Sequence, residues 1–432
     1  MKFFITLGII AALGAGFFFL YVPRKIVIDN GSGVAQIADS GNSVPVLEVP
    51  EAPETPSSTE AQKNGNGDIE KQPWLPNPPT VVKAVYATGW SAGSVSRKNA
   101  LISLIKKNEL NGIVIDIKDY SGYVSYKTGI PEVAGAGAEK EIRILRPNAL
   151  IKELHDAGIY VIARVTVFQD PILARAHPEW ALKDKVTGKT WADNHKLSWI
   201  DPAAEGAWDY VAAIAKDASS RGFDEINFDY VRFPSDGALE NATYPFWNGA
   251  NQKHEQIAKF FRYLRKELSG ITISADLFGL TTVAIDDLGI GQVIEDAYAS
   301  FDYVSPMIYP SHYSAGFIGY KNPAQYPYEV VRYSLENGTK KLATMIRKMT
   351  AATSTATTST ASTSSQASSV ISHQSLAKLR PWLQVFDMGA VYDKGMIQAQ
   401  IKATEDVLLH GSSTDAYAGW LLWDPANRYE RL

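Results

Sequence analysis

Two aspartates in separate stretches of the sequence are the residues best suited to chemistry. Asp229 lies within Glu-Ile-Asn-Phe-Asp-Tyr-Val-Arg-Phe-Pro at 225–234, and Asp276 lies within Ser-Ala-Asp-Leu-Phe-Gly at 274–279. Apolar and polar residues alternate before both, which predicts that each carboxyl group stands near the end of a strand. Two such groups can hydrolyse a glycosidic bond: one attacks or stabilises the anomeric carbon, and the other, protonated, releases the leaving oxygen. We therefore predict Asp229 as nucleophile or charge stabiliser and Asp276 as general acid.

A structural explanation of Asp229 is also available. A buried carboxylate is costly without a partner, and Arg232 follows closely in the sequence, so the two could form an ion pair. The two explanations are compatible, because Arg232 or Arg164 could keep Asp229 ionised during catalysis. Burial and the nearby negative charge would then raise the pKa of the second carboxyl group.

Other polar and aromatic residues fall at the predicted ends of further strands and are candidates for substrate binding. They are Asp116, Arg164, Asn227, Arg232, Tyr309, His312, Trp423 and Asp424. Trp423 could form the floor of a sugar subsite or belong to the core. Asp116 is explained equally well by an ion pair with a neighbouring Lys or Arg. His312 could be an ordinary hydrogen-bonded surface histidine.

The elements that must position these residues alternate between short apolar runs and helical stretches. Strands are predicted at 82–90, 112–119, 160–168, 225–234, 272–278, 303–309, 380–386 and 417–423. Helices are predicted at 96–108, 147–157, 203–221, 255–268, 290–300, 328–337 and 395–409. This alternation indicates an α/β fold, a (β/α)8 TIM barrel, whose active site forms at the C-terminal ends of the strands.

A long loop at 170–202 follows the third predicted strand. It contains Trp180, Trp191 and Trp199. Long loops in compact domains are often functional, so these rings could line sugar subsites. They could equally pin the loop to the barrel, and the sequence leaves both explanations open.

The first part of the chain differs from the barrel in composition. An almost unbroken apolar run at 3–21 can span a bilayer. It is longer than the usual apolar core of a cleaved signal, so 1–25 is predicted to be an uncleaved membrane anchor rather than a signal peptide. Residues 26–80 are rich in Pro, Ser and Gly and are predicted to form a disordered linker. The barrel at 81–432 would then lie outside the cytoplasm, at the cell surface.

A second low-complexity stretch lies within the barrel sequence. Residues at about 350–370 are almost entirely Ala, Ser and Thr. They lack periodicity and have little to bury, so they are predicted to be a disordered insertion ahead of the seventh strand.

The composition excludes several kinds of chemistry. The chain contains no Cys, which removes disulfides, thiolate metal sites and cysteine nucleophiles. The net charge of -4 does not suggest a nucleic-acid partner. The His residues are scattered along the sequence. No metal and no cofactor is predicted.

Four strings of residues resemble the bacterial glycosyl hydrolase-like domain family. They lie at 225–234, 274–279, 307–313 (Met-Ile-Tyr-Pro-Ser-His-Tyr) and 419–425 (Gly-Trp-Leu-Leu-Trp-Asp-Pro). The resemblance implies a TIM barrel distantly similar to α-amylase-type enzymes, with Asp229 at the position of the strand-four nucleophile. In those enzymes the strand-five acid is usually Glu, whereas this chain has the shorter Asp276.

Two functions from different classes follow. The first is a glycoside hydrolase that cleaves a cell-envelope or environmental polysaccharide. The alternative is a non-catalytic glycan-binding barrel at the cell surface. Carboxyl groups about 5–5.5 Å or 6.5–9.5 Å apart would indicate retaining or inverting catalysis, whereas an Arg or Lys between them would favour binding alone.

Overall fold

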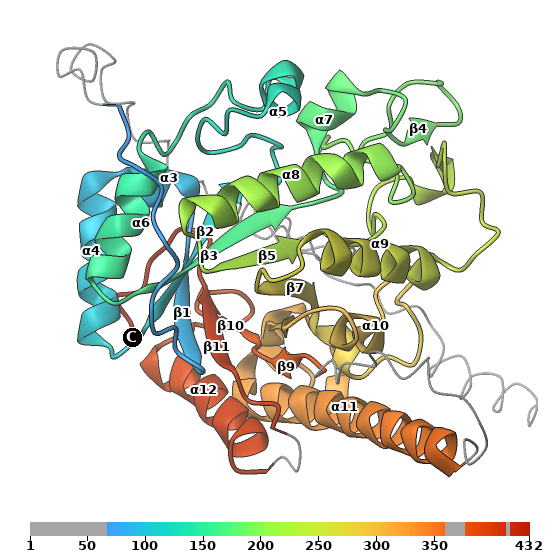
Figure 1. Cartoon of the computed structure of the whole chain (residues 1–432). Helices are drawn as coiled ribbons and strands as arrows, with labels where there is room; N and C mark the ends of the chain where they lie inside the picture. Colours follow the sequence, from blue (N-terminus) through green and yellow to red (C-terminus); the bar gives the residue numbers. More distant parts are fainter. Residues whose placement is uncertain (1–66, 359–375, 412–414) are drawn as a thin grey trace, which may run out of the picture.

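A closed parallel sheet forms the centre of the computed structural model, which describes residues 67–358, 376–411 and 415–432 (Figure 1). The strands in spatial order are β10 (Trp382–Gln384), β11 (Gly419–Trp423), β1 (Val82–Ala87), β2 (Gly112–Lys118), β3 (Tyr160–Thr166), β5 (Glu225–Asp229), β7 (Ile273–Phe278), β8 (Tyr303–Ile308) and β9 (Lys378–Leu379). β10 also pairs with β8, which closes the sheet. The predicted barrel is confirmed.

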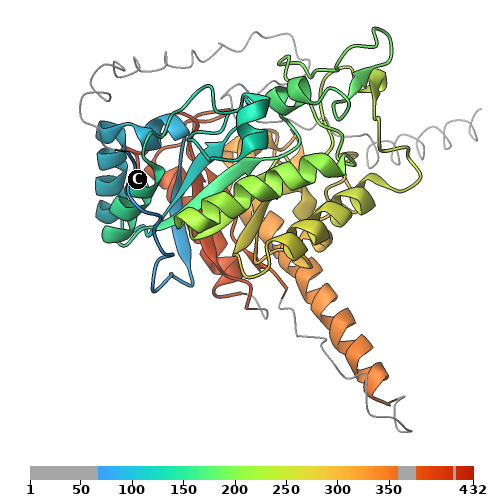
Figure 2. The same cartoon turned by 45° about the horizontal axis from the view of Figure 1, so that its top comes forward.

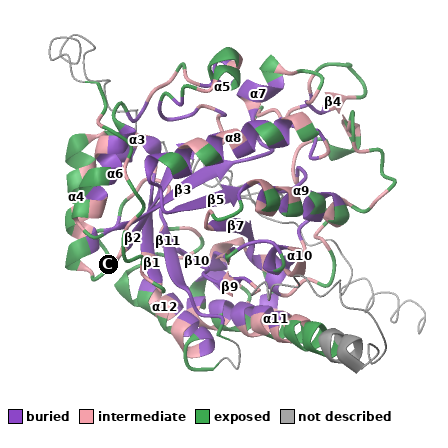
Figure 3. Cartoon of the chain, viewed as in Figure 1, coloured by how far each residue is buried: buried purple, intermediate pink, exposed green. Residues whose placement is uncertain are grey.

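The seventh strand of the barrel is divided into two short strands, β9 and β10. β9 and β10 pair in succession with the same strand, β8, and Pro381 lies between them. Proline has no N–H to donate to a ladder, so it interrupts the strand predicted at 380–386. The other strands of the barrel are continuous, and their residues are almost all buried (Figure 3).

Helices surround the sheet. They are α3 (Gly89–Gly93), α4 (Val95–Lys107), α5 (Pro131–Ala136), α6 (Pro147–Asp156), α7 (Pro171–Ala176), α8 (Glu205–Arg221), α9 (Lys253–Glu267), α10 (Ile294–Tyr298), α11 (Pro327–Thr358) and α12 (Lys394–Leu408). Six of them (α4, α6, α8, α9, α10 and α12) lie close to predicted segments, whereas α3, α5 and α7 were not predicted. Gly222 ends α8 in the left-handed conformation, with φ 107°, as the glycine stop signal predicts.

Short elements complete the connections. The 3-10 helices are η1 (Leu239–Asn241), η2 (Gly279–Thr282), η3 (Pro310–His312), η4 (Phe317–Gly319) and η5 (Pro323–Gln325), and β4 (Lys183–Asp184) pairs with β6 (Ala242–Thr243) in a separate two-stranded sheet. The first strand is shorter than predicted because the side chain of Thr88 accepts a hydrogen bond from Ser91 N and starts α3.

The helix α11 is longer than the segment predicted at 328–337. It continues to Thr358 and projects beyond the barrel (Figure 2). No Pro or Gly lies between Thr339 and Thr358, and Ala has the highest helix propensity, so nothing in this stretch stops the helix. The first part of the predicted disordered insertion is therefore helical. Residues 359–375 lie outside the described part of the chain.

The end of the predicted disordered linker packs against the barrel. Within 67–80, which we name the strap, Trp74 Nε1 donates to Ser219 O at 3.1 Å and Leu75 N donates to Asp224 Oδ1 at 2.6 Å. The carboxyl group of Asp68 accepts N–H groups of Asn148 and Ala149, at 2.8 and 3.1 Å. The prediction of disorder is therefore wrong for the strap, because its few anchoring side chains find partners that composition does not reveal.

Asp68 supplies a helix cap from a remote part of the chain. The residue before α6, Arg146, makes no side-chain capping bond, and unpaired N–H groups at a helix start are costly. We expect Asp68→Ala to destabilise the protein by about 1 kcal/mol, as loss of an N-cap usually does. Urea unfolding of residues 67–432 would measure this, with Glu70→Ala on the same strap as control. Equal effects of the two variants would contradict the capping role.

A buried ion pair crosses the lower part of the barrel. Glu225 and Arg380 are both fully buried, and Arg380 Nη1 donates to Glu225 Oε2 at 3.1 Å. Ser274 Oγ donates to Glu225 Oε1 at 2.5 Å. We expect Glu225→Ala to cost about 3–5 kcal/mol, because it leaves the arginine buried without its partner. Thermal unfolding would test this, and a smaller loss in the double variant with Arg380→Met would show that the unpaired charge causes the damage.

The predicted membrane anchor at 3–21 lies outside the described residues. Among the helices of the described ranges, none is long and apolar enough to cross a membrane. The anchor therefore stays a prediction.

Candidate active site

A small cavity lies where the C-terminal ends of the strands meet. Its lining residues are Arg164, Asp229, Asp276, Met307, Tyr309, Trp382 and Trp423. Its volume is about 10 Å³, which is close to the minimum that one water molecule requires. The two predicted catalytic residues thus share one cavity, at the end of the barrel where the fold predicts an active site.

The sheet register brings the two aspartates together. β5 and β7 are neighbours, with Asn227 paired to Ser274 and Phe228 to Ala275. One residue further along, Asp229 therefore lies beside Asp276. Both are buried, at 4% and 1% exposure. The adjacency that the alternating pattern predicted is confirmed.

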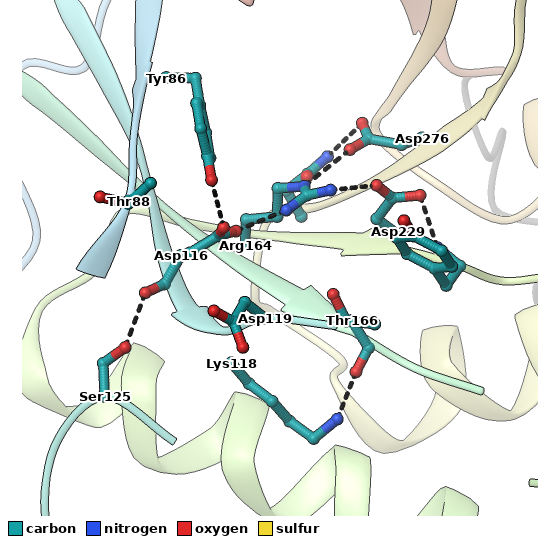
Figure 4. Close-up of polar contacts among 12 residues, drawn as sticks. Tyr86, Thr88, Asp116, Lys118, Asp119, Ser125, Arg164, Thr166, Asp229 and Asp276 are labelled. Carbon is teal, nitrogen blue, oxygen red and sulfur yellow. Dashed lines mark hydrogen bonds and ion pairs between the residues drawn. The ribbon is translucent and has the colours of Figure 1, made fainter. Parts of the chain in front are cut away.

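Arg164, on β3, connects three carboxyl groups (Figure 4). Its Nη1 donates to Asp116 Oδ1 at 2.6 Å, and its Nη2 donates to Asp229 Oδ2. Its Nε lies 3.5 Å from Asp276 Oδ2. One buried cation therefore offsets part of the negative charge of three acids.

Asp276 is the acid whose environment favours a proton. Its Oδ1 accepts two hydrogen bonds, from Asn227 Nδ2 at 2.9 Å and from Trp382 Nε1 at 2.8 Å. Burial, and secondly the charge of Asp229, raise the pKa of Asp276 to about 8. At neutral pH the group is therefore mostly protonated, which a general acid requires.

Hydrogen-bond donors contact both oxygens of Asp229. Besides the contact with Arg164, its Oδ1 accepts the N–H of Tyr230 at 2.5 Å. Tyr230 has a φ of 54°, a conformation that costs energy for a non-glycine residue and that clusters at functional sites. This local turn ends β5 and directs the backbone N–H at the carboxylate. Both carboxyl oxygens of Asp229 thus accept a hydrogen bond, one from Arg164 and one from Tyr230 N.

Asp116 lies on the far side of Arg164 from Asp229 (Figure 4). Its Oδ2 accepts the hydroxyl of Tyr86 at 2.5 Å, so each of its oxygens has a donor. Burial raises the pKa of Asp116. Asp116 does not line the cavity, and its contacts are those of a residue that holds Arg164.

Arg232 does not form the ion pair that its position in the sequence suggested. The cation that contacts Asp229 is Arg164. Arg232 donates instead to Phe233 O at 3.2 Å and to Ser235 Oγ at 2.8 Å. The left-handed turn at Tyr230 breaks the strand alternation, so residues after it no longer point along the predicted directions.

Tyr309 and His312 form one side of the site. Tyr309 lines the cavity, and the ring of His312 packs against it with centroids 5.3 Å apart. His312 Nδ1 lies 3.0 Å from Ser311 Oγ, and Ser311 Oγ donates to Gln384 Oε1 at 2.9 Å. Burial lowers the pKa of His312 to about 4, so the imidazole is neutral at pH 7.

Trp423 and Asp424 occupy different environments. Trp423 lines the cavity, but its ring is stacked on Tyr86 at 3.9 Å and is 3% exposed. It is a wall rather than the exposed platform expected for a sugar ring. Asp424 lies outside the cavity lining, where its Oδ1 accepts Ala426 N at 2.7 Å and orders the C-terminal turn.

The sequence analysis missed two residues that complete the site. Trp382 donates to the proposed acid, and Tyr86 donates to Asp116. Trp382 directly follows Pro381, in a strand of three residues that is too short to show a clear alternation, so the sequence did not single it out. For Tyr86, no pattern in the sequence pointed to the site.

Two of the three tryptophans in the long loop at 170–202, Trp191 and Trp199, belong to the buried core. Trp191 and Trp199 are 2% and 0% exposed. Their Nε1 atoms donate to Ala238 O at 3.1 Å and to Asp193 Oδ2 at 2.9 Å. The structure therefore supports the packing explanation of these rings rather than the explanation as sugar subsites.

The described ranges contain no group of three or more His, Cys, Asp or Glu side chains that could hold a metal ion. The cation that faces the acids of this site is the guanidinium of Arg164.

Comparison with protein families identifies the class of the chain. Residues 84–352 and 345–429 match the model of the family described as "Putative glycosyl hydrolase domain". The protein belongs to this family, which agrees with the resemblance of its strand-end motifs. No curated protein matches the sequence.

Several solved structures are similar to the chain, and the first of those below, with a TM-score above 0.5, supports the same fold. The chain is similar to the glycoside hydrolase domain of PgaB (BpsB) from Bordetella bronchiseptica, with 12% identity over 80% of this chain and 94% of that one, and a TM-score of 0.51. A hypothetical protein from Ruminiclostridium thermocellum shares 40% identity over 48% of this chain and 98% of its own, with a TM-score of 0.41. The glycoside hydrolase domain of PelA from Pseudomonas aeruginosa has 10% identity over 81% of this chain and 97% of its own, with a TM-score of 0.41.

Proposed function

We propose that the protein is a glycoside hydrolase that cleaves a cell-envelope or environmental polysaccharide. The observation that carries the proposal is the pair Asp229 and Asp276, whose carboxyl groups line one buried cavity. Arg164 and Tyr230 N donate hydrogen bonds to Asp229. Burial keeps the proton on Asp276. Glycoside hydrolysis requires this division of roles between two carboxyl groups.

The proposed reaction assigns one task to each group. Asp276 transfers its proton to the glycosidic oxygen, the bond from this oxygen to the anomeric carbon breaks, and the bonding electrons stay with the leaving oxygen. Asp229 attacks the anomeric carbon or stabilises its developing positive charge. Water then completes hydrolysis. Since both carboxyl groups contact one guanidinium, they lie near enough to act on the same bond.

A second candidate is a glycan-binding barrel without catalytic activity. Its support is Arg164, which contacts both carboxyl groups and thus stands where a sugar would have to react. The small size of the cavity also favours this candidate, because a polysaccharide chain needs more room than about 10 Å³. In a hydrolase, the walls of the cavity must move when the substrate binds.

One experiment separates the two candidates. Residues 67–432 would be incubated with a panel of bacterial and plant polysaccharides and with 4-nitrophenyl glycosides. Release of reducing ends or of nitrophenol by the wild-type protein, and not by Asp229→Asn, is the expected result. Binding to a glycan on an array without any release would support the binding barrel and overturn the hydrolase.

The location of the barrel is part of the proposal. The apolar run at 3–21 is long enough to span a bilayer, and an enzyme that degrades a polymer needs access to it outside the cytoplasm. We therefore propose that the chain is membrane-anchored with the barrel outside the cytoplasm. Fractionation of cells expressing the full chain, followed by protease treatment of intact cells, would test this.

A further inference from the structure

We infer that Arg164 is a positioning residue whose Nε–H stabilises the anion formed on Asp276 when this acid gives up its proton. The inference rests on the proposed function, because it concerns the acid step of hydrolysis. It gives Arg164 a second role, distinct from its contacts with Asp116 and Asp229.

The guanidinium of Arg164 has one nitrogen without a hydrogen-bond partner. Arg164 is 4% exposed. Nη1 and Nη2 donate to Asp116 and Asp229, whereas Nε is buried and has no partner among the described residues. The nearest carboxyl oxygen is Asp276 Oδ2, at 3.5 Å. An unpaired N–H in a buried site is costly, so its presence beside an acid calls for an explanation.

The hydrogen bonds of Asp276 show which oxygen carries the proton. Oδ1 accepts from both Asn227 Nδ2 and Trp382 Nε1. A proton on Oδ1 would face these donors, so the proton belongs on Oδ2. Oδ2–H and Arg164 Nε–H are then two donors that face each other. Two donors repel, which accounts for a separation of 3.5 Å instead of a hydrogen bond.

Loss of the proton changes this contact from repulsion to attraction. Once the proton has moved to the glycosidic oxygen, Oδ2 is an anionic acceptor. Arg164 Nε–H can then donate to it at about 2.7–2.9 Å, the length of a charge-assisted hydrogen bond. The bond forms as the proton leaves and does not exist before, so it lowers the energy of the transition state relative to the ground state.

The other charges around Asp276 act in different directions. Asp229 opposes ionisation of Asp276, and Arg164 favours it. Asp116 contacts Arg164 and accepts a hydrogen bond from Tyr86. Glu225 is paired with Arg380. Asn227 and Trp382 are neutral. Arg164 is therefore the cation placed to receive the charge that proton transfer leaves behind.

The first test needs no substrate. Aspartate carboxyl carbons labelled with 13C would be titrated by NMR in the wild type and in Arg164→Lys, with the Asp276 signal assigned from Asp276→Asn. The lysine keeps a positive charge but lacks the Nε–H. We expect the pKa of Asp276 to rise in Arg164→Lys by about one or more, a tenfold weaker acid. Arg221→Lys, at a buried arginine far from the cavity, is the matched control. An unchanged pKa in Arg164→Lys would overturn the inference.

The second test uses the leaving group of a hydrolysed glycoside. A poor leaving group such as an alkyl alcohol needs the acid, whereas 2,4-dinitrophenol does not. Arg164→Lys is expected to lower kcat/KM for the alkyl glycoside about 10–100-fold more than for the dinitrophenyl glycoside. Equal losses of kcat/KM for the two glycosides would mean that Arg164 acts through Asp229 or only supports the structure, and would contradict the inference. If the wild type hydrolyses no glycoside, the proposed function fails, and the NMR titration still decides whether Arg164 stabilises ionised Asp276.

Discussion

Asp229→Asn is expected to lower kcat/KM for the glycoside that the protein hydrolyses by about 10⁴-fold or more, in the range seen when a nucleophile is removed. Asparagine keeps the size of the side chain but can neither attack nor stabilise the anomeric carbon. The same change removes the negative charge that helps to raise the pKa of Asp276. Any residual activity should therefore be lost at a lower pH than in the wild type.

Initial rates with the glycoside found by the panel would measure this effect. Asp302→Asn is the matched control, because Asp302 contacts Arg265 and Ile273 N at the opposite end of the barrel. Near-ultraviolet circular dichroism of both variants would establish that the fold is intact. A well-folded Asp229→Asn with activity within tenfold of the wild type would remove Asp229 from the catalytic pair.

Asp276 is expected to set the alkaline limit of activity. Its pKa is about 8, raised by burial and by Asp229. The acid must be protonated to act, so kcat/KM should fall as the pH rises through about 8. Asp276→Asn removes the acid and should abolish this alkaline limb. It should also cost about 10²–10⁴-fold for substrates with poor leaving groups.

The leaving group provides the control for this prediction. Activated aryl glycosides need little protonation, so Asp276→Asn should retain most of its activity toward them. A pH–rate profile of wild type and variant with both kinds of substrate would show the difference. An alkaline limb that persists in the variant would mean that another group titrates there.

Periodicity made the barrel and the positions of the two candidate aspartates predictable. Alternation along Glu225–Asp229 and Ile273–Phe278 placed both aspartates at strand ends, and parallel strands bring their ends to one rim. Arg164 was a candidate for the same reason. These inferences need only the local sequence and the rule that the C-terminal ends of barrel strands meet at one rim.

Side-chain partners across the barrel were not predictable in the same way. Arg232 is close to Asp229 in sequence, yet the positive φ of Tyr230 separates them. Trp382 belongs to a short strand next to Pro381, whose weak pattern hid its role. The strap buries few residues, and its hydrogen bonds go to helix ends that lie far away in the sequence. Such contacts arise from tertiary packing and leave no local signature.

The interrupted seventh strand, β9 and β10, connects the buried ion pair at the lower end of the barrel to Asp276. Arg380 lies just before Pro381 and pairs with Glu225, while Trp382 lies just after it and donates to Asp276. A chain of hydrogen bonds runs in parallel. Ser274 donates to Glu225 and accepts from Asn227, which donates to Asp276. Two separate routes therefore transmit a disturbance of the buried ion pair to the proton of the acid. A substitution made for stability at the Glu225–Arg380 ion pair would therefore shift the pH range in which Asp276 is protonated and the proposed enzyme is active.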